Sequence, residues 1–326
     1  MKKIIDQISY PIKNDIVEFN KFMKDSLSSE VKLINSVINY IMNVKGKQFR
    51  SILCLLCARI DGNKPNSLTL LSASTVEILH VATLLHDDVV DDAEIRRGWP
   101  SINKIWKNKI SILVGDYMFS KALNNIARIN DMNCINILSE ISRRLSEGEI
   151  MQIEKAIKKN MTENDYYKMI SDKTASLISA SCYLGFYSNN KDERLGESIK
   201  KFGEYLGIAY QIKDDLFDII GNINQTGKPS NSDLKKNMLT LPYIYSLNNL
   251  NSSSKKQFLN TIKQYVSKND KNKIKKIIFD NGGIEYSNKK IKDYSNLAKA
   301  ELDNFADSIY KDSLLKAVDF NLNRKY

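Results

Sequence analysis

The chain has 326 residues and a formal net charge of +11, and its 13 glycines and 5 prolines are few for that length. It contains no linker rich in proline, glycine or serine and no repeat of fixed period, so residues 1–326 are expected to form one large domain. Neither an apolar run of about 18 residues nor a secretory signal is evident, so we expect a cytoplasmic protein without a transmembrane segment.

The positive charge would suit nucleic acid, an anionic membrane or anionic substrates. Lysines are densest in the last third, where they alternate with asparagine and isoleucine as on solvated helix faces. No zinc finger, helix-turn-helix or basic-aromatic alternation is present, so nucleic-acid binding is not expected. Cys54 and Cys57 form a single CxxC inside an apolar run, which predicts buried, reduced thiols rather than a zinc site.

Apolar residues recur at helical spacing along most of the chain, and strand-like alternation is nearly absent. The sequence therefore predicts an all-α protein of many packed helices. The predicted helices cover residues 34–41, 52–60, 70–90, 110–129, 135–157, 166–187, 199–220, 239–247 and 258–278. Residues 72–90 are apolar on almost every face, which indicates a buried central helix.

This central helix ends in an acidic motif formed by Asp87, Asp88 and Asp91. On a helix Asp87 and Asp91 lie one turn apart on one face, with His80 on the same stripe. Like charges in this arrangement repel each other unless a cation neutralises them. Mg²⁺ takes one or two protein carboxylates together with waters and substrate phosphates, so the motif predicts a magnesium site.

A second motif of the same spacing, Asp214, Asp215 and Asp218, ends the predicted helix 199–220, with Gln211 one turn earlier. Both motifs follow strongly apolar segments, which would place carboxylates at the rim of a core. Such a rim suits a substrate with a diphosphate head and a hydrocarbon tail. Two exposed acidic helix ends without metal remain the alternative interpretation.

Diphosphates also need cationic partners, and the guanidinium fork of arginine matches phosphate oxygens. Taken singly, basic residues beside the motifs would be ordinary surface cations, but their joint occurrence favours a phosphate-binding role. The candidate contacts are Lys47, Arg50, Arg96, Arg97, Lys173, Thr174 and Lys228. His80 is a further candidate, whereas His86 points off the stripe and is expected to be structural.

In order and spacing, these residues resemble the trans-isoprenyl (polyprenyl) diphosphate synthases, most closely the long-chain octaprenyl and heptaprenyl types. The matching motifs are GKxxR at 46–50, ExxH at 77–80, HDDVVD at 86–91, RRG at 96–98, VGDY at 114–117, EGEIMQ at 147–152, KTA at 173–175, GxAYQIKDDLFD at 207–218 and GKP at 227–229. The resemblance implies a single large helical bundle of the isoprenoid synthase type with a central active-site cavity. It also implies a Mg²⁺-dependent prenyltransferase that works as a homodimer and contacts membranes transiently to release product.

The resemblance assigns a role to each candidate. Isopentenyl diphosphate would be bound by Lys47, Arg50, His80 and Arg97. The allylic diphosphate would be bound by Arg96, Lys173, Thr174, Gln211 and Lys228. Both acidic motifs would hold magnesium, and Asp87, Asp88, Asp91, Asp214, Asp215 and Lys173 would be catalytic. Two positions depart from the family pattern: Ser51 stands where proline is usual, and Met238 stands where lysine is usual.

The predicted reaction is ionisation of the allylic diphosphate, with positive charge stabilising the departing diphosphate and a dry apolar pocket protecting the allylic cation. Ala82 and Thr83 lie one turn deeper than Asp87 and are small, which predicts an open route for the growing chain. We therefore expect a product of about C30–C45, suited to a quinone side chain. The alternatives are a shorter farnesyl or geranylgeranyl diphosphate synthase, a class I terpene cyclase and a regulatory synthase subunit. The alternative interpretation of Ala82 is that it simply packs against a neighbouring helix.

Overall fold

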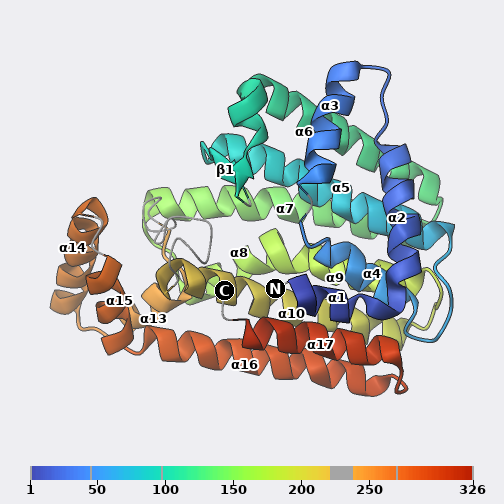
Figure 1. The fold of residues 1–326 in the computed structure, drawn as a ribbon. Helices are drawn as coiled ribbons and strands as arrows, with labels where there is room; N and C mark the ends of the chain where they lie inside the picture. Colours follow the sequence, from blue (N-terminus) through green and yellow to red (C-terminus); the bar gives the residue numbers. More distant parts are fainter. Residues whose placement is uncertain (1, 45, 97, 221–237, 269–270, 325–326) are drawn as a thin grey trace. The chain divides into compact units, whose positions relative to one another are not determined.

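The computed structural model describes residues 2–44, 46–96, 98–220, 238–268 and 271–324 (Figure 1). The N-terminal helices are α1 (Lys2–Ile8), η1 (Tyr10–Ile12), α2 (Lys13–Ser26), α3 (Lys32–Asn43), α4 (Phe49–Ala58) and α5 (Ser67–Val90). A hairpin of β1 (Ile95–Arg96) and β2 (Trp99–Pro100) precedes α6 (Ile102–Ile129), α7 (Met132–Lys158), α8 (Glu163–Ile170), the π-helical turn η2 (Ser171–Ala175), α9 (Ser176–Tyr187) and α10 (Glu193–Ile220). The rest comprises α13 (Leu241–Asn248), α14 (Ser252–Lys268), α15 (Lys271–Asp280), α16 (Gly283–Glu301), η3 (Leu302–Asn304) and α17 (Ile309–Asn323).

The predicted all-α class is confirmed, and the two-residue strands of the hairpin are the only sheet among the residues described. Two predicted helices are wrong in detail. The segment predicted as one helix over residues 166–187 is divided into α8, η2 and α9, and the segment over 258–278 is divided into α14 and α15. A 3.6-residue apolar period does not signal a single inserted residue in a helix.

The chain forms two compact units whose segments alternate along the sequence. Unit 1 comprises Met1–Ser142, Leu177–Gly203 and Glu301–Ala317. Unit 2 comprises Arg143–Ser176, Glu204–Ala300 and Val318–Tyr326. The first acidic motif belongs to unit 1 and the second to unit 2.

In unit 1, α5 is the central helix, as predicted. Asn66 caps its first turn in a reciprocal capping box with Thr69, and every residue from Thr69 to Leu79 is buried. By length and composition alone α5 could cross a membrane, but 72% of its most apolar window is buried within the protein. That burial is the pattern of a core helix.

All four cysteines lie in unit 1, and each is buried and free, as predicted for Cys54 and Cys57. Burial raises the pKa of the Cys54 thiol well above its ordinary value and has the same effect on the pKa of Cys57. Burial also raises the pKa of Cys134, to about 12. These thiols therefore stay protonated and serve as small apolar core residues.

Unit 2 is built on α8, α10 and α13, whose buried side chains form one apolar cluster that includes Tyr166, Ile212, Leu216 and Leu241. A capping box between Thr162 and Asp165 begins α8. The C-terminal part of α10 lies in this cluster, so the carboxylates of the second motif stand at the end of a helix that the core holds firmly.

Candidate active site

The first acidic motif closes α5, and its side chains divide between two faces of the helix. Asp87 and His80 are half-buried, and Asp91, at the C-cap, is exposed. Asp88, by contrast, is only 2% exposed, and Ala82 is completely buried. The stripe predicted from His80 to Asp91 therefore lies on the accessible side of α5, while Asp88 lies on its buried side.

Asp88 is bound by an arginine of the β-hairpin. The Nε and Nη2 atoms of Arg96 both lie 2.6 Å from Oδ1 of Asp88. Asn103 Nδ2 also donates to the Asp88 main-chain oxygen at 3.2 Å. Asp88 thus fixes Arg96, a predicted allylic contact, beside the helix end. Arg97 and Lys228, two further predicted contacts, fall outside the described residues.

A largely apolar pocket in unit 1 adjoins this helix end. The turn before α4 contributes Gly46 and Gln48 to its lining, and α5 contributes Glu77 and Val81. The structure therefore places the GKxxR motif, with Lys47 in the turn and Arg50 in the first turn of α4, beside the ExxH stretch of α5. Lys47 and Arg50 are themselves half-buried.

The departure at Ser51 has a structural role. Its hydroxyl donates to Glu77 Oε2 at 2.7 Å, and both residues are buried. A buried carboxylate needs such a partner, and a proline at this position has no side-chain donor.

Helix α6 packs against α5 and explains His86. The His86 Nε2 atom lies 3.3 Å from Asp116 Oδ1, and a Cβ added to Gly115 would come within 2.3 Å of that nitrogen. The imidazole therefore fills the space between the two helices, which agrees with the structural role predicted for it.

In unit 2 the predicted allylic contacts form a hydrogen-bonded chain with the second motif. Thr174 Oγ1 donates to Gln211 Oε1 at 2.8 Å, and Gln211 Nε2 donates to Asp215 Oδ1 at 2.7 Å. The other oxygen of Asp215 accepts from the hydroxyl of Tyr166 at 2.7 Å. Tyr166 and Asp215 are both buried. Sequence reasoning missed Tyr166, whose only sequence signal was an apolar helical pattern.

Lys173 precedes Thr174 in the π-helical turn, but its side chain is bound to residues of α7. Its Nζ atom donates to Gln152 Oε1 at 3.0 Å and is ion-paired with Glu149. Glu149 and Gln152 belong to the EGEIMQ motif, for which the sequence suggested no role. Their position in that motif was the signal that could have identified them.

The carboxylate of Asp214 is ion-paired with Arg324, whose side chain is 5% exposed. The guanidinium of Arg324 stacks 4.4 Å from the ring of Tyr210 and 5.0 Å from that of Phe217. Burial, followed by repulsion from Arg324, lowers the pKa of neighbouring Lys213. No sequence signal indicated Arg324, which lies 110 residues from Asp214.

Comparison with known proteins identifies the family. The family model described as polyprenyl synthetase matches residues 31–280. The chain belongs to the polyprenyl synthetase family. It is 34% identical over 276 residues to heptaprenyl diphosphate synthase component 2 of Bacillus subtilis (strain 168), with 81% of this chain and 78% of that protein covered.

Two solved structures have the same fold. The decaprenyl diphosphate synthase from Rhodobacter capsulatus aligns with a TM-score of 0.90 at 30% identity and covers 98% of this chain and 99% of its own. The polyprenyl synthase from Caulobacter crescentus CB15, complexed with calcium and isoprenyl diphosphate, aligns with a TM-score of 0.89 at 28% identity. The alignment covers 99% of this chain and 98% of that one. The predicted isoprenoid synthase fold and the predicted class of enzyme, a polyprenyl diphosphate synthase, are confirmed.

Members of the polyprenyl synthetase family depend on metal, and the donors of this chain fit a hard cation. Among the described residues, no three histidine, cysteine, aspartate or glutamate side chains converge on one point. Mg²⁺ needs only one or two protein carboxylates when waters and phosphate oxygens complete its shell. Paired carboxylates one helical turn apart, as at Asp87 and Asp91 or at Asp214 and Asp218, supply such donors.

Proposed function

We propose that this polyprenyl synthetase condenses an allylic diphosphate repeatedly with isopentenyl diphosphate, giving an all-trans product of about C30–C45 that serves as a quinone side-chain precursor. The observation that carries the proposal is the chain from Thr174 through Gln211 to Asp215. It joins two groups suited to a diphosphate to Asp215, the buried member of the second acidic motif.

The metal of the proposed reaction is Mg²⁺. Asp87, Asp91, Asp214 and Asp218 lie on accessible helix faces and are the proposed direct ligands. Asp88 and Asp215, which we predicted as ligands as well, are buried and bound by protein donors, which favours a role in orienting Arg96 and Gln211. Bound Mg²⁺ would stabilise the charge that develops on the departing diphosphate.

The remaining candidates bind the two substrates. Lys47, Arg50 and His80, all in unit 1, are the proposed contacts for isopentenyl diphosphate. Arg96, Lys173, Thr174 and Gln211 are the proposed contacts for the allylic diphosphate, together with Lys228. Arg97 keeps its predicted role at the isopentenyl diphosphate site. The ammonium of Lys173, now held by Glu149, would donate to a diphosphate oxygen and stabilise the leaving group.

The structure refines the proposal on product length. Ala82 is completely buried within unit 1, which supports the alternative that it packs against a neighbouring helix. Thr83 is half-buried on the accessible side of α5, and its hydroxyl donates to its own helix at the oxygen of His80, 2.9 Å away. We propose that Thr83 rather than Ala82 borders the route of the growing chain. The heptaprenyl and decaprenyl relatives support a long product.

We propose that the protein is cytoplasmic and forms a homodimer. We also propose that both units belong to one synthase domain, because the family match over residues 31–280 includes segments of both. Exposed apolar side chains on α6, among them Ile112, Leu113 and Leu123, offer a surface for a second copy. The Bacillus relative is named component 2 of its synthase, so the alternative to a homodimer is that this chain requires a different partner subunit.

The deciding experiment incubates the purified protein alone with labelled isopentenyl diphosphate, farnesyl diphosphate and Mg²⁺, and analyses product length by mass spectrometry. A long polyprenyl diphosphate is expected. A product of about C20 or shorter would establish the shorter-chain alternative, a cyclic hydrocarbon would indicate a cyclase, and no product without an added partner would indicate a regulatory subunit.

Two substitutions test the metal ligands. Asp87→Asn and Asp214→Asn should each lower kcat by about three orders of magnitude or more, because each loses several kcal/mol of charge stabilisation. Asp92→Asn is the matched control, because Asp92 is an exposed neighbour of the first motif and asparagine tolerates its left-handed backbone, with a φ of 49°. A motif variant that keeps a tenth of the activity would contradict the assignment of that motif.

A further inference from the structure

The π-helical turn η2 is an unusual element at the proposed site. It carries Lys173 and Thr174 between two regular helices, α8 and α9. One inserted residue rotates the helix that follows by about 100° around its axis. The directions of Lys173 and Thr174 relative to α8 therefore depend on this turn being kept.

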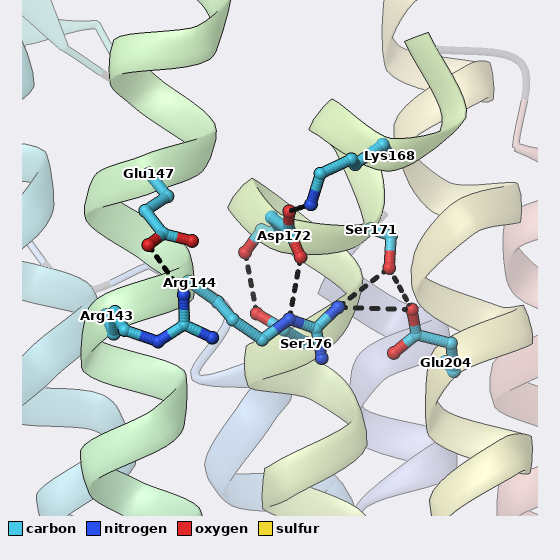
Figure 2. Close-up of polar contacts among 8 residues, drawn as sticks. All are labelled: Arg143, Arg144, Glu147, Lys168, Ser171, Asp172, Ser176 and Glu204. Carbon is cyan, nitrogen blue, oxygen red and sulfur yellow. Dashed lines mark hydrogen bonds and ion pairs between the residues drawn. The ribbon is translucent and has the colours of Figure 1, made fainter. Parts of the chain in front are cut away.

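Asp172, the second residue of the turn, is bound from two sides. Arg144 Nε donates to its Oδ1 at 2.7 Å, and Lys168 Nζ donates to its Oδ2 at 2.9 Å (Figure 2). The Asp172 side chain is 8% exposed. Burial opposes its ionisation, but the hydrogen bonds from Lys168 and Arg144 outweigh burial, and the pKa of Asp172 is lowered.

Arg144 connects the turn to two other helices. From α7 its Nη2 atom donates to Ser171 Oγ at 2.8 Å and lies 3.7 Å from Glu204 Oε1 of α10. The Ser171 hydroxyl in turn donates to Glu204, as Figure 2 shows. One guanidinium thus ties the first two residues of the turn to α7 and to the helix that carries the second acidic motif.

The backbone of the turn is held just as closely. A Cβ added to Gly148, one helical turn after Arg144 on α7, would lie 2.8 Å from the main-chain nitrogen of Lys173. Ser176 Oγ donates to the Asp172 main-chain oxygen at 2.7 Å. Arg144 and Gly148 therefore form one face of α7 that fits against the turn.

We propose that Arg144 and Asp172 are positioning residues that keep the π-helical turn in the geometry that presents Lys173 and Thr174 to the allylic diphosphate. Neither residue contacts the substrate. The inference rests on the proposed function, because it takes Lys173 and Thr174 to be the allylic contacts.

The neighbouring Arg143 provides a matched control. It precedes Arg144 on α7 and is paired with Glu147 at 2.5 Å, but both side chains of this pair are more than half exposed. Arg143→Met and Arg144→Met remove the same group from adjacent positions of one helix. The contacts to Ser171 and Asp172 described above belong to Arg144, so the second substitution removes them.

The experiment measures both substrates and the backbone. Arg144→Met should raise the KM for the allylic diphosphate about ten- to hundredfold and leave that for isopentenyl diphosphate within about twofold of wild type. Hydrogen exchange of the amides from 171 to 176, without substrate, should become about tenfold faster. Arg144→Lys, which keeps the charge but not the fork, should fall between wild type and Arg144→Met and serves if the methionine variant fails to fold.

The inference is overturned if exchange in the turn stays at the wild-type rate, if both KM values rise equally, or if Arg143→Met has the same effect. Lys173→Ala and Thr174→Ala, measured in parallel, test the proposed function separately. Should those two variants leave the allylic KM unchanged, the contact assignment fails, whereas faster exchange in Arg144→Met still shows that Arg144 holds the turn.

Discussion

Adjacent tyrosines of α8 provide a test of the buried second motif. Tyr166 donates its hydroxyl to Asp215 at 2.7 Å and is completely buried. The hydroxyl of Tyr167 is also buried, but it has no hydrogen-bond partner in the part of the chain that the structure describes. The two rings lie edge to face with centroids 5.7 Å apart, so phenylalanine at either position keeps the packing.

The same chemical change should therefore have opposite effects at the two positions. Tyr166→Phe removes a charge-assisted hydrogen bond from a buried carboxylate, which should lower the free energy of unfolding by about 1.5–3 kcal/mol. Tyr167→Phe removes a hydroxyl that was desolvated without a bond, so the free energy of unfolding should stay the same or rise by about 1 kcal/mol.

Urea unfolding followed by far-ultraviolet circular dichroism at pH 7, without substrate, measures both changes. Tyr166→Phe should also raise the Mg²⁺ concentration needed for half-maximal activity, because Asp215 would hold Gln211 less firmly, while Tyr167→Phe should leave it unchanged. Equal losses in the two variants, or a loss below about 0.5 kcal/mol in Tyr166→Phe, would refute this account of Asp215.

Three other substitutions have defined outcomes. Thr83→Phe should shorten the main product to about C15–C20, measured by mass spectrometry, and an unchanged product would contradict the proposed route. Ala82→Phe should instead overpack a filled site and lower the free energy of unfolding by about 1–3 kcal/mol. Arg324→Met should lower the Mg²⁺ concentration at half-maximal rate, since its ion pair competes with metal for Asp214, and a higher concentration would instead assign Arg324 an orienting role. The pKa of Asp172 is lowered from 3.8, so its ionised carboxylate stabilises the fold above that pH. The difference in the free energy of unfolding between wild type and Asp172→Asn should therefore be largest at pH 7 and become smaller below pH 3.8.

Helical spacing was enough to predict the central helix and the stripe from His80 to Asp91. Residues three, four, seven or eleven apart share a helix face, so the sequence alone places His80 and Asp91 on one side of α5. The same rule does not show how far each face is buried. The second aspartate of each motif, Asp88 or Asp215, therefore looked equivalent to its neighbours in the sequence, although protein donors bind it in the fold.

Other parts of the site depend on contacts that no local pattern contains. The π-helical turn requires an inserted residue held by Arg144, which lies 28 residues from Asp172. Arg324 reaches Asp214 from the residue that follows the last helix, α17, 110 residues away in the sequence. Long-range pairing of polar side chains is decided by tertiary packing, which single-sequence periodicity does not encode.

The distribution of cysteines makes the protein convenient for site-specific labelling. All four thiols lie buried in unit 1, and the raised pKa values of Cys54, Cys57 and Cys134 keep them from forming the reactive thiolate. A cysteine introduced at an exposed position of unit 2, such as Ile157 at 74% exposure, should therefore be the one group that reacts with a maleimide in the native protein. A fluorophore or spin label could then report on α7 during turnover without first removing the natural cysteines.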